Sequence, residues 1–306
     1  MLASMNNSAS VSLFTRLSLA WQANRPAMQR RQARHDCEIF RRFVKTVEAA
    51  GRRVKGARIL DIGCGYRYPI TLLLHNSGAQ VTGIDVEFVA RRLSLVELGK
   101  HLVRRGPKAF ARRLVRELVH KEVYFRALER AFGRPLLFDG LELRQTRIED
   151  LVDEGQWDLV FSNAAFEHVA DVEGAVAAIA RVIKPGGLAY ISIHLFASLS
   201  GGHDLALSVS GGAGVVLRPG ALPWQHLRDT RWKAPTYLNR LREHEYREIF
   251  ARHVRILEWK VETPEPDTYL TEEILRELPD YGREELLKRS VVVVAEKASE
   301  ARLSQC

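Results

Sequence analysis

A glycine-containing turn at residues 61–65, with the sequence DIGCG, constrains the fold more than any other feature of this 306-residue chain. It follows the short apolar run 57–63, which is typical of a buried parallel strand. It precedes a predicted helix over 69–76 that begins with proline, a residue favoured in a first helical turn. A second apolar run over 79–85 completes a strand–helix–strand unit of about 30 residues.

Two carboxylates near this turn indicate a nucleoside ligand. Asp85 ends the second predicted strand, 20 residues after Gly65, where a carboxylate can accept hydrogen bonds from both ribose hydroxyls. A dinucleotide site would place a third glycine where Tyr68 stands. Asp61, just before the glycines, would not favour a pyrophosphate but would favour a ligand that carries an ammonium and a sulfonium. A strand–helix turn without a ligand is the plainer alternative.

The rest of the chain alternates between strand and helix patterns, which predicts a doubly wound α/β sheet. Apolar runs predict further strands at 141–148, 157–163, 187–196, 255–262 and 290–297. Helical periodicity predicts helices over 27–50, 172–183, 236–253 and 271–288. Residues 197–235 are rich in Gly, Pro and Ser and show little periodicity, so we expect a long functional or mobile loop there.

Positive charge is concentrated in two segments of a chain whose formal net charge is +9. Residues 1–56 carry a surplus of +8 and residues 87–139 a surplus of +7. Such segments can attract polyanions such as RNA, although solvated helix faces are the plainer explanation. We expect 87–139 to be a helical insertion that covers the active site. Residues 11–21 are moderately apolar and could lie on a membrane surface or dock on the protein.

The three cysteines, Cys37, Cys64 and Cys306, suit neither a disulfide framework nor a zinc site. We therefore expect a reducing, cytoplasmic location. No apolar run approaches the roughly 18 residues of a membrane span.

Four motifs in order resemble those of class I S-adenosylmethionine-dependent methyltransferases, in the broad type 11 group that includes ubiquinone-biosynthesis-like enzymes. They are ILDIGCG (59–65), VTGIDVE (81–87), WDLVFSNAAFEHV (157–169) and RVIKPGGLAYIS (181–192). The resemblance implies a Rossmann-like, seven-stranded sheet whose last strand is antiparallel. We expect a helical extension over 1–55 and a methyltransferase domain over 56–299, with a substrate-side loop and helix at 197–250.

The resemblance also implies which residues hold the cofactor, S-adenosyl-L-methionine. Asp61, Gly63, Cys64 and Gly65 would line its methionine end. Asp85 and Val86 would take the ribose, Ile148 would flank the adenine, and Asn163 would lie near the transferring methyl. Two positions depart from the family pattern. Arg67 stands where the family often has a small residue. Arg147 stands where an acid often precedes the adenine-flanking residue, so Glu149, Asp150 or the backbone would form the hydrogen bonds to the adenine.

Methyl transfer requires alignment of acceptor, methyl and sulfur, and a hydroxyl acceptor benefits from a general base. The candidate bases are His168, His194 and His203, although histidines in such places are more often structural hydrogen-bond partners. His194 and His203 are the better pair, because the segment that joins them, HLFASLSGGHD, is rich in polar residues and adjacent to the expected methyl site. No metal site is expected, since the histidines lack a ligand spacing.

The preferred function is methyl transfer, with O-methylation favoured, to a small molecule or glycan. An aromatic and polar stretch over 224–239 suits sugars or aromatic ligands, or a loop pinned to the surface. The segment from His194 onward resembles bacterial methyltransferases of surface-glycan or secondary-metabolite clusters. The alternatives are an RNA-directed methyltransferase and a non-catalytic protein that binds the cofactor or a partner.

Overall fold

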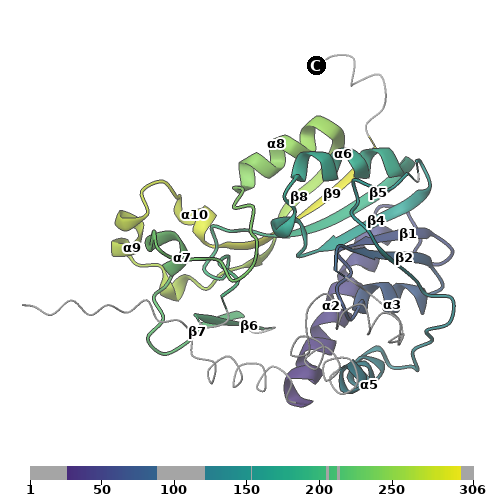
Figure 1. The fold of residues 1–306 in the computed structure, drawn as a ribbon, viewed down its shortest axis with the longest axis horizontal. Coiled ribbons are helices and arrows are strands. Elements are labelled where there is room, and N and C mark those ends of the chain that lie inside the picture. The colour runs from purple at the N-terminus through teal and green to yellow at the C-terminus, as the bar shows by residue number, and fades with distance from the viewer. Residues whose placement is uncertain (1–25, 88–120, 153, 205–206, 212–213, 298–306) are drawn as a thin grey trace, which may run out of the picture.

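A seven-stranded sheet forms the centre of the molecule in a computed structural model, which describes residues 26–87, 121–152, 154–204, 207–211 and 214–297 (Figure 1). The strand order is β3-β2-β1-β4-β5-β9-β8. The strands are β1 (Arg58–Ile62), β2 (Gln80–Asp85), β3 (Glu142–Gln145), β4 (Trp157–Asn163), β5 (Ile183–His194), β8 (Val254–Pro264) and β9 (Lys288–Lys297). β9 is antiparallel to both neighbours, β5 and β8, while β1 to β5 pair in parallel, so the expected Rossmann-like sheet is confirmed.

Helices cover both faces of this sheet, as a doubly wound fold requires (Figure 1). One apolar cluster joins the sheet to α2 (Pro26–Ala49), α3 (Pro69–His75) and α5 (Lys121–Phe132). The second cluster joins the opposite face to α6 (Val172–Val182) and α8 (Glu243–His253). The helix predicted over 27–50 is therefore present as α2, and it packs directly on the sheet.

Aromatic contacts attach α2 to the sheet. Phe43 is fully buried, and its ring lies 4.9 Å from that of Phe161 on β4 and 5.5 Å from that of Tyr190 on β5. The rings of Phe161 and Tyr190 stack on each other. Within the described residues, α2 is thus part of the main core. The side of α2 that faces away from Phe43 is free to line a site.

The segment after β5 is more structured than its composition predicts. Residues 197–235 contain a hairpin of β6 (Ser208–Gly211) and β7 (Gly214–Leu217), and the short helix α7 (Gln225–Arg228). The long functional or mobile loop that was expected here contains secondary structure, because the segment buries Leu199, Val215 and Trp224 in a third apolar cluster. That cluster includes residues of α9 (Glu272–Glu277) and α10 (Arg283–Leu286), the two helices between β8 and β9. Short strands rich in glycine and serine lack the periodicity that reveals longer ones.

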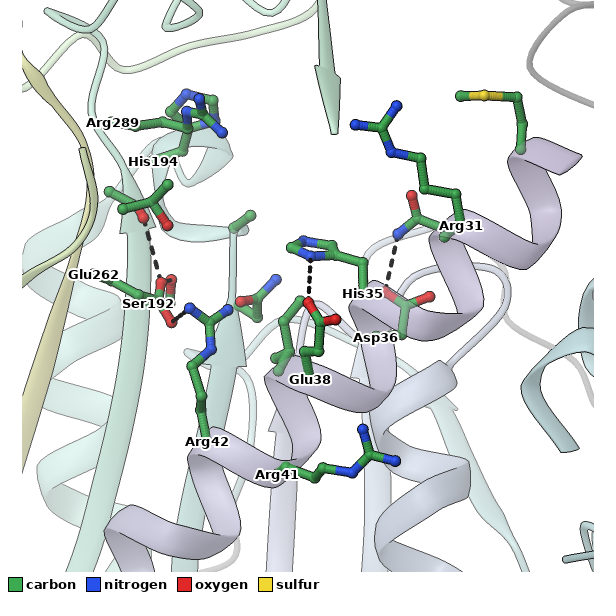
Figure 2. Close-up of a pocket in the computed structure, with 17 residues that line it drawn as sticks. Arg31, His35, Asp36, Glu38, Arg41, Arg42, Ser192, His194, Glu262 and Arg289 are labelled. Atoms are coloured by element: carbon green, nitrogen blue, oxygen red, sulfur yellow. Dashed lines mark hydrogen bonds and ion pairs between the residues drawn. The ribbon is translucent and has the colours of Figure 1, made fainter. Parts of the chain in front are cut away.

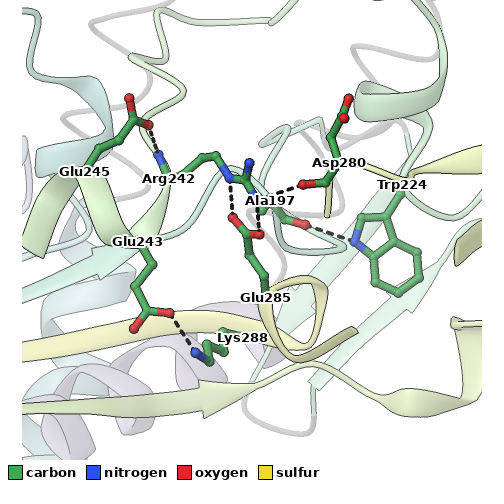
Figure 3. A network of polar contacts seen from close by, with 8 residues as sticks. All are labelled: Ala197, Trp224, Arg242, Glu243, Glu245, Asp280, Glu285 and Lys288. Atoms are coloured by element: carbon green, nitrogen blue, oxygen red, sulfur yellow. Dashed lines mark hydrogen bonds and ion pairs between the residues drawn. The ribbon is translucent and has the colours of Figure 1, made fainter. Parts of the chain in front are cut away.

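Polar contacts also secure this part of the chain (Figure 3). The indole Nε1–H of Trp224 donates to the carbonyl of Ala197 at 3.1 Å. Arg242, at the start of α8, pairs with Glu285 of α10, and its Nη2 donates to the carbonyl of Asp280. The segment between β5 and α8 is therefore anchored at both ends.

Two predicted features lie partly or wholly outside the described residues. Residues 11–21 are not described, and of the insertion predicted over 87–139 the structure describes Glu87 and residues 121–139, which include α5. Within the described part of the chain, no helix is both long and apolar enough to cross a membrane.

Candidate functional site

The glycine turn after β1 takes the conformation that only glycine adopts readily. Gly63 has φ +71° and Gly65 has φ +68°. The backbone N–H groups of Gly63 and Cys64 both donate to the carbonyl of Ile84 on β2, at 2.9 and 3.1 Å. A Cβ at Gly63 would lie 2.4 Å from the Cβ of Ala165, whereas a Cβ at Gly65 would meet no atom within 4 Å. Gly63 is needed for packing, and Gly65 faces open space.

Asp85 closes the other side of this turn. Its Oδ2 accepts the backbone N–H of Gly65 and its Oδ1 accepts that of Glu87, both at 2.8 Å. Burial raises the pKa of Asp85, against the opposing effect of these two hydrogen bonds. Val86, the next residue, is exposed. Asp85 is therefore a half-buried carboxylate at the edge of the open space beside Gly65.

Asp61 lies beneath the turn and is almost completely buried. Its Oδ2 accepts a hydrogen bond from the hydroxyl of Thr71 on α3 at 2.5 Å. Burial raises the pKa of Asp61 to about 7, and the neighbouring charge of Asp85 contributes to the shift. Cys64 is also buried, which raises the pKa of its thiol and keeps it neutral.

The remaining predicted cofactor residues lie at the same edge of the sheet. β4 pairs in parallel with β1, so that Ser162 lies opposite Ile62 and its hydroxyl donates to the Ile62 carbonyl at 2.9 Å. Asn163 follows immediately and is half-buried. Ile148, after β3, is buried in the same apolar cluster as Ile62. The sequence-predicted cofactor residues thus gather around the carboxyl ends of β1 to β4.

Arg67, one of the departures from the family pattern, has a structural explanation. Its guanidinium carbon lies 5.0 Å from the ring centroid of Tyr66 and 4.6 Å from that of Tyr124 on α5. The hydroxyl of Tyr124 donates to Asp36, a buried residue of α2. The arginine therefore joins the glycine turn to α5, in place of a small residue.

A cavity of about 810 Å³ opens beside Asn163, between α2 and the ends of the central strands (Figure 2). The strand side includes Asn163, Ser192, His194 and Arg289. The helix side presents polar residues of α2: Arg31, Gln32, His35, Asp36, Glu38, Arg41 and Arg42. A cavity of this size suits a small organic ligand.

The carboxylate of Glu262, on β8, links residues of the sheet and of α2 beside this cavity. It accepts hydrogen bonds from the hydroxyls of Ser192 and Tyr190, at 2.5 and 3.2 Å. The Ser290 hydroxyl donates to it at 3.3 Å, and the guanidinium of Arg42 lies 3.5 Å away. Figure 2 shows Arg42 reaching from α2 toward this carboxylate. The ion pair ties the helix wall to the sheet.

The three candidate histidines lie together. The ring centroid of His203 is 4.5 Å from that of His194 and 5.0 Å from that of His168. The prediction had paired only His194 with His203. Burial lowers the pKa of His203 to about 4 and that of His194 well below its ordinary value, so both rings are neutral at pH 7. Of the three, His194 lines the cavity.

A chain of buried hydrogen bonds orients His194. The hydroxyl of Ser200 donates to Oε1 of Glu265 at 2.8 Å and therefore accepts at 3.0 Å from Nε2–H of His194. Arg289 donates to Oε2 of Glu265 at 3.1 Å. In this arrangement Nδ1 of His194 carries the lone pair, as a general base requires.

Sequence reasoning missed Glu167, which directly precedes His168. Its side chain is only 3% exposed, and within the described residues neither carboxylate oxygen completes a hydrogen bond. Burial raises the pKa of Glu167 to about 8, although the backbone N–H groups of Glu167 and His194 favour the charged form. Glu262 and Glu265 were missed as well, because neither belongs to a motif.

A family model described as a methyltransferase domain matches residues 29–253. Curated relatives include the ubiquinone biosynthesis O-methyltransferase of Rhizobium rhizogenes, 29% identical over 160 residues, which are 52% of this chain and 48% of the relative. The enzyme of the same name from Bordetella avium is 29% identical over 147 residues, 47% of this chain and 45% of the relative. The matched region spans about half the length of these curated relatives.

Solved structures also resemble this chain. An S-adenosylmethionine-dependent methyltransferase from Mesorhizobium loti aligns with a TM-score of 0.44 at 17% identity, covering 82% of this chain and 95% of the other. A 1,6-didemethyltoxoflavin-N1-methyltransferase from Burkholderia thailandensis, with S-adenosylhomocysteine bound, aligns with a TM-score of 0.39 at 14% identity, covering 92% of this chain and 81% of the other.

Proposed function

This chain belongs to the methyltransferase-domain family and is an S-adenosylmethionine-dependent enzyme, and from this premise we propose that it methylates a hydroxyl group of a small molecule or glycan. The curated relatives named as O-methyltransferases support oxygen as the acceptor atom. The observation that carries the proposal is a neutral, oriented histidine, His194, in the wall of a cavity that also includes Asn163.

The residues at the carboxyl ends of β1 and β2 fit the cofactor. A Cβ built on Gly65 would meet no atom within 4 Å beyond its chain neighbours, so a ligand can approach the backbone there. Asp85, which borders this space, would accept hydrogen bonds from the ribose hydroxyls. Asp61 would favour the positively charged methionine end, because a buried carboxylate is stabilised by a nearby cation. When bound, S-adenosylmethionine supplies a methyl group on a positively charged sulfur.

The cavity between α2 and the strands would hold the acceptor. Methyl transfer depends on alignment and on exclusion of water, and α2 covers one side of the cavity. Nδ1 of His194 would take the proton of the acceptor hydroxyl as the oxygen–methyl bond forms. Ser200 and Glu265 would keep the imidazole in the tautomer that leaves Nδ1 free.

The experiment is a screen of phenols, catechols, hydroxy acids and sugars for release of S-adenosylhomocysteine, followed by mass spectrometry of the product. For an acceptor found in this way, we expect His194→Ala to lower kcat by roughly 100-fold or more, with the affinity for S-adenosylhomocysteine unchanged. His244→Ala, at an exposed position on α8, is the matched control and should retain full activity. Methylation at nitrogen or carbon, or full activity of His194→Ala, would contradict the proposal.

A further inference from the structure

One carboxylate and two imidazoles lie within ligand distance of one another where β4 and β5 end. One ligand atom from each of Glu167, His168 and His203 lies within 4.8 Å of the other two. The closest approach between Glu167 and His203 is 3.9 Å, between Oε1 and Nε2. Two ligands that each lie about 2.0–2.2 Å from one ion are at most about 4.4 Å apart, so small side-chain movements would bring this set to an ion.

The buried carboxylate of Glu167 is incompletely satisfied by the described part of the chain: the backbone N–H groups of Glu167 and His194 favour its charged form, but neither oxygen completes a hydrogen bond. A buried carboxylate without hydrogen bonds is costly, whether it is charged or neutral. Both oxygens of Glu167 are buried and unpartnered, and so is Nε2 of His203, which faces them. A cation between these atoms would satisfy all three at once.

His168 already has the hydrogen bond that orients a metal ligand. Its Nδ1 lies 2.8 Å from the carbonyl of Tyr237, so Nδ1–H donates to that oxygen and Nε2 keeps its lone pair. Histidines that bind metals almost always donate their second N–H to a carbonyl or carboxylate in this way.

Asn239 holds the short turn that carries Glu167 and His168. Its side-chain amide donates to the carbonyls of Phe166 and Val169, at 2.7 and 3.0 Å, and its backbone N–H donates to the carbonyl of Glu167. The hydroxyl of Tyr246 donates in turn to Oδ1 of Asn239. The two ligands are therefore fixed relative to each other before any ion arrives, as a preformed site requires.

We propose that Glu167, His168 and His203 bind a divalent transition-metal ion, with Zn²⁺ as the best match. Imidazole nitrogens and one carboxylate suit zinc, iron or cobalt better than magnesium or calcium, which prefer oxygen ligands alone. Three protein ligands leave a position open for a further oxygen, as in catalytic zinc sites.

The role of this ion rests on the proposed function. The ring of His203 packs on His194, which lines the acceptor cavity, whereas the three ligands do not line it, so the ion would act on the acceptor through His194. By fixing the ring of His203, the ion would hold His194 in position to remove the proton of the acceptor hydroxyl. The proton would pass to His194, the oxygen–methyl bond would form, and the carbon–sulfur bond would break with its electron pair remaining on sulfur.

The test measures metal binding directly on the full chain. Purified protein is treated with a chelator and titrated with Co²⁺, and the visible absorption of bound Co²⁺ is followed; Zn²⁺ is then added in competition. We expect one equivalent to bind and Zn²⁺ to displace it. Glu167→Gln and His203→Ala should each weaken Co²⁺ binding by at least tenfold, whereas His244→Ala, a surface histidine, should bind as the unaltered chain does.

A second measurement covers the case in which a variant fails to fold. Zn²⁺ should raise the midpoint of thermal unfolding of the unaltered protein, and a chelator should reverse the shift. No saturable Co²⁺ binding by the unaltered protein, or equal loss in His244→Ala, would overturn the metal site. Binding of S-adenosylhomocysteine is measured in the same samples. If that binding is tight while metal binding is absent, the metal proposal fails and the methyltransferase function stands.

Discussion

The carboxylate of Asp85 accepts the backbone N–H of Gly65 at 2.8 Å, and this bond connects the end of β2 to the glycine turn after β1. The second oxygen of the same carboxylate accepts the N–H of Glu87. The side chain that we propose for the ribose therefore also shapes the turn that faces the ligand. Its two oxygens are held in place before binding, which lowers the cost of ordering them.

Asp85→Ala is expected to weaken S-adenosylhomocysteine binding by roughly 10- to 100-fold, because hydrogen bonds to charged groups contribute about 1.5–3 kcal/mol. The fold should persist, since the side chain is only half-buried. Isothermal titration calorimetry measures the affinity, and circular dichroism monitors the fold. Glu87→Gln, two residues away and exposed, is the control. Unchanged affinity in Asp85→Ala would refute the ribose role.

Binding of S-adenosylhomocysteine is expected to release a proton from Asp61 below about pH 7, where this carboxyl titrates in the free protein. The ammonium of the ligand favours the charged carboxylate, so the affinity should rise with pH by up to about tenfold per unit until pH 7 and then level off. Calorimetry in two buffers that differ in ionisation enthalpy measures this proton. Asp61→Asn should bind more weakly and should lose this proton release; the same release from the variant would exclude Asp61 as its source.

Two alanine substitutions in the glycine turn should have different effects. Both Gly63 and Gly65 have positive φ, which costs a residue with a Cβ roughly 1–2 kcal/mol. Gly63→Ala adds an overlap with Ala165, so its free energy of unfolding should fall further, by about 1–3 kcal/mol. Gly65→Ala should fold but bind S-adenosylhomocysteine poorly. Urea denaturation and calorimetry distinguish the two.

Ala165→Gly combined with Gly63→Ala provides the control for this overlap. Removing the Cβ at residue 165 should recover part of the lost stability, while leaving the cost of the positive φ. If the double variant is no more stable than Gly63→Ala, the clash is not the cause.

Phe43→Ala is expected to lower the free energy of unfolding by about 3–5 kcal/mol, as for other fully buried aromatic residues. The loss should appear in one cooperative transition, seen alike by circular dichroism and by tryptophan fluorescence, because α2 shares its apolar cluster with the sheet. The boundary predicted between residues 55 and 56 stays a prediction. Two separate transitions would support that boundary, and a single one would argue that α2 folds with the domain.

Local patterns were sufficient to predict most of the central sheet. The strand over 157–163 has the bounds that were predicted, because its apolar centre, residues 159–161, is followed by the polar Ser162 and Asn163. The glycine turn and Asp85 were predicted together, since both follow directly from a strand end. Each of these signals lies within a few residues of the feature that it indicates.

Features that depend on distant segments could not be predicted in this way. Glu262 and Glu265 lie in or just after an edge strand, yet their partners Ser192 and Ser200 lie some 65–70 residues earlier. Nothing in the sequence around Glu167 shows that its carboxylate is buried beside His203. Such pairs become visible only when the sheet brings separate strand ends together.

One side of α2 packs in the apolar core and the other side lines the cavity, and this separation has a consequence for evolution and engineering. Phe43 and its buried neighbours secure the core, whereas Arg31, His35, Glu38 and Arg42 recur at helical spacing along the cavity. A library that varies only Arg31, His35 and Glu38 would alter the wall of the proposed acceptor cavity while leaving the buried residues and the ion pair between Arg42 and Glu262 in place. Divergence in substrate range among descendants of such a chain would accumulate along this one stripe of a helix.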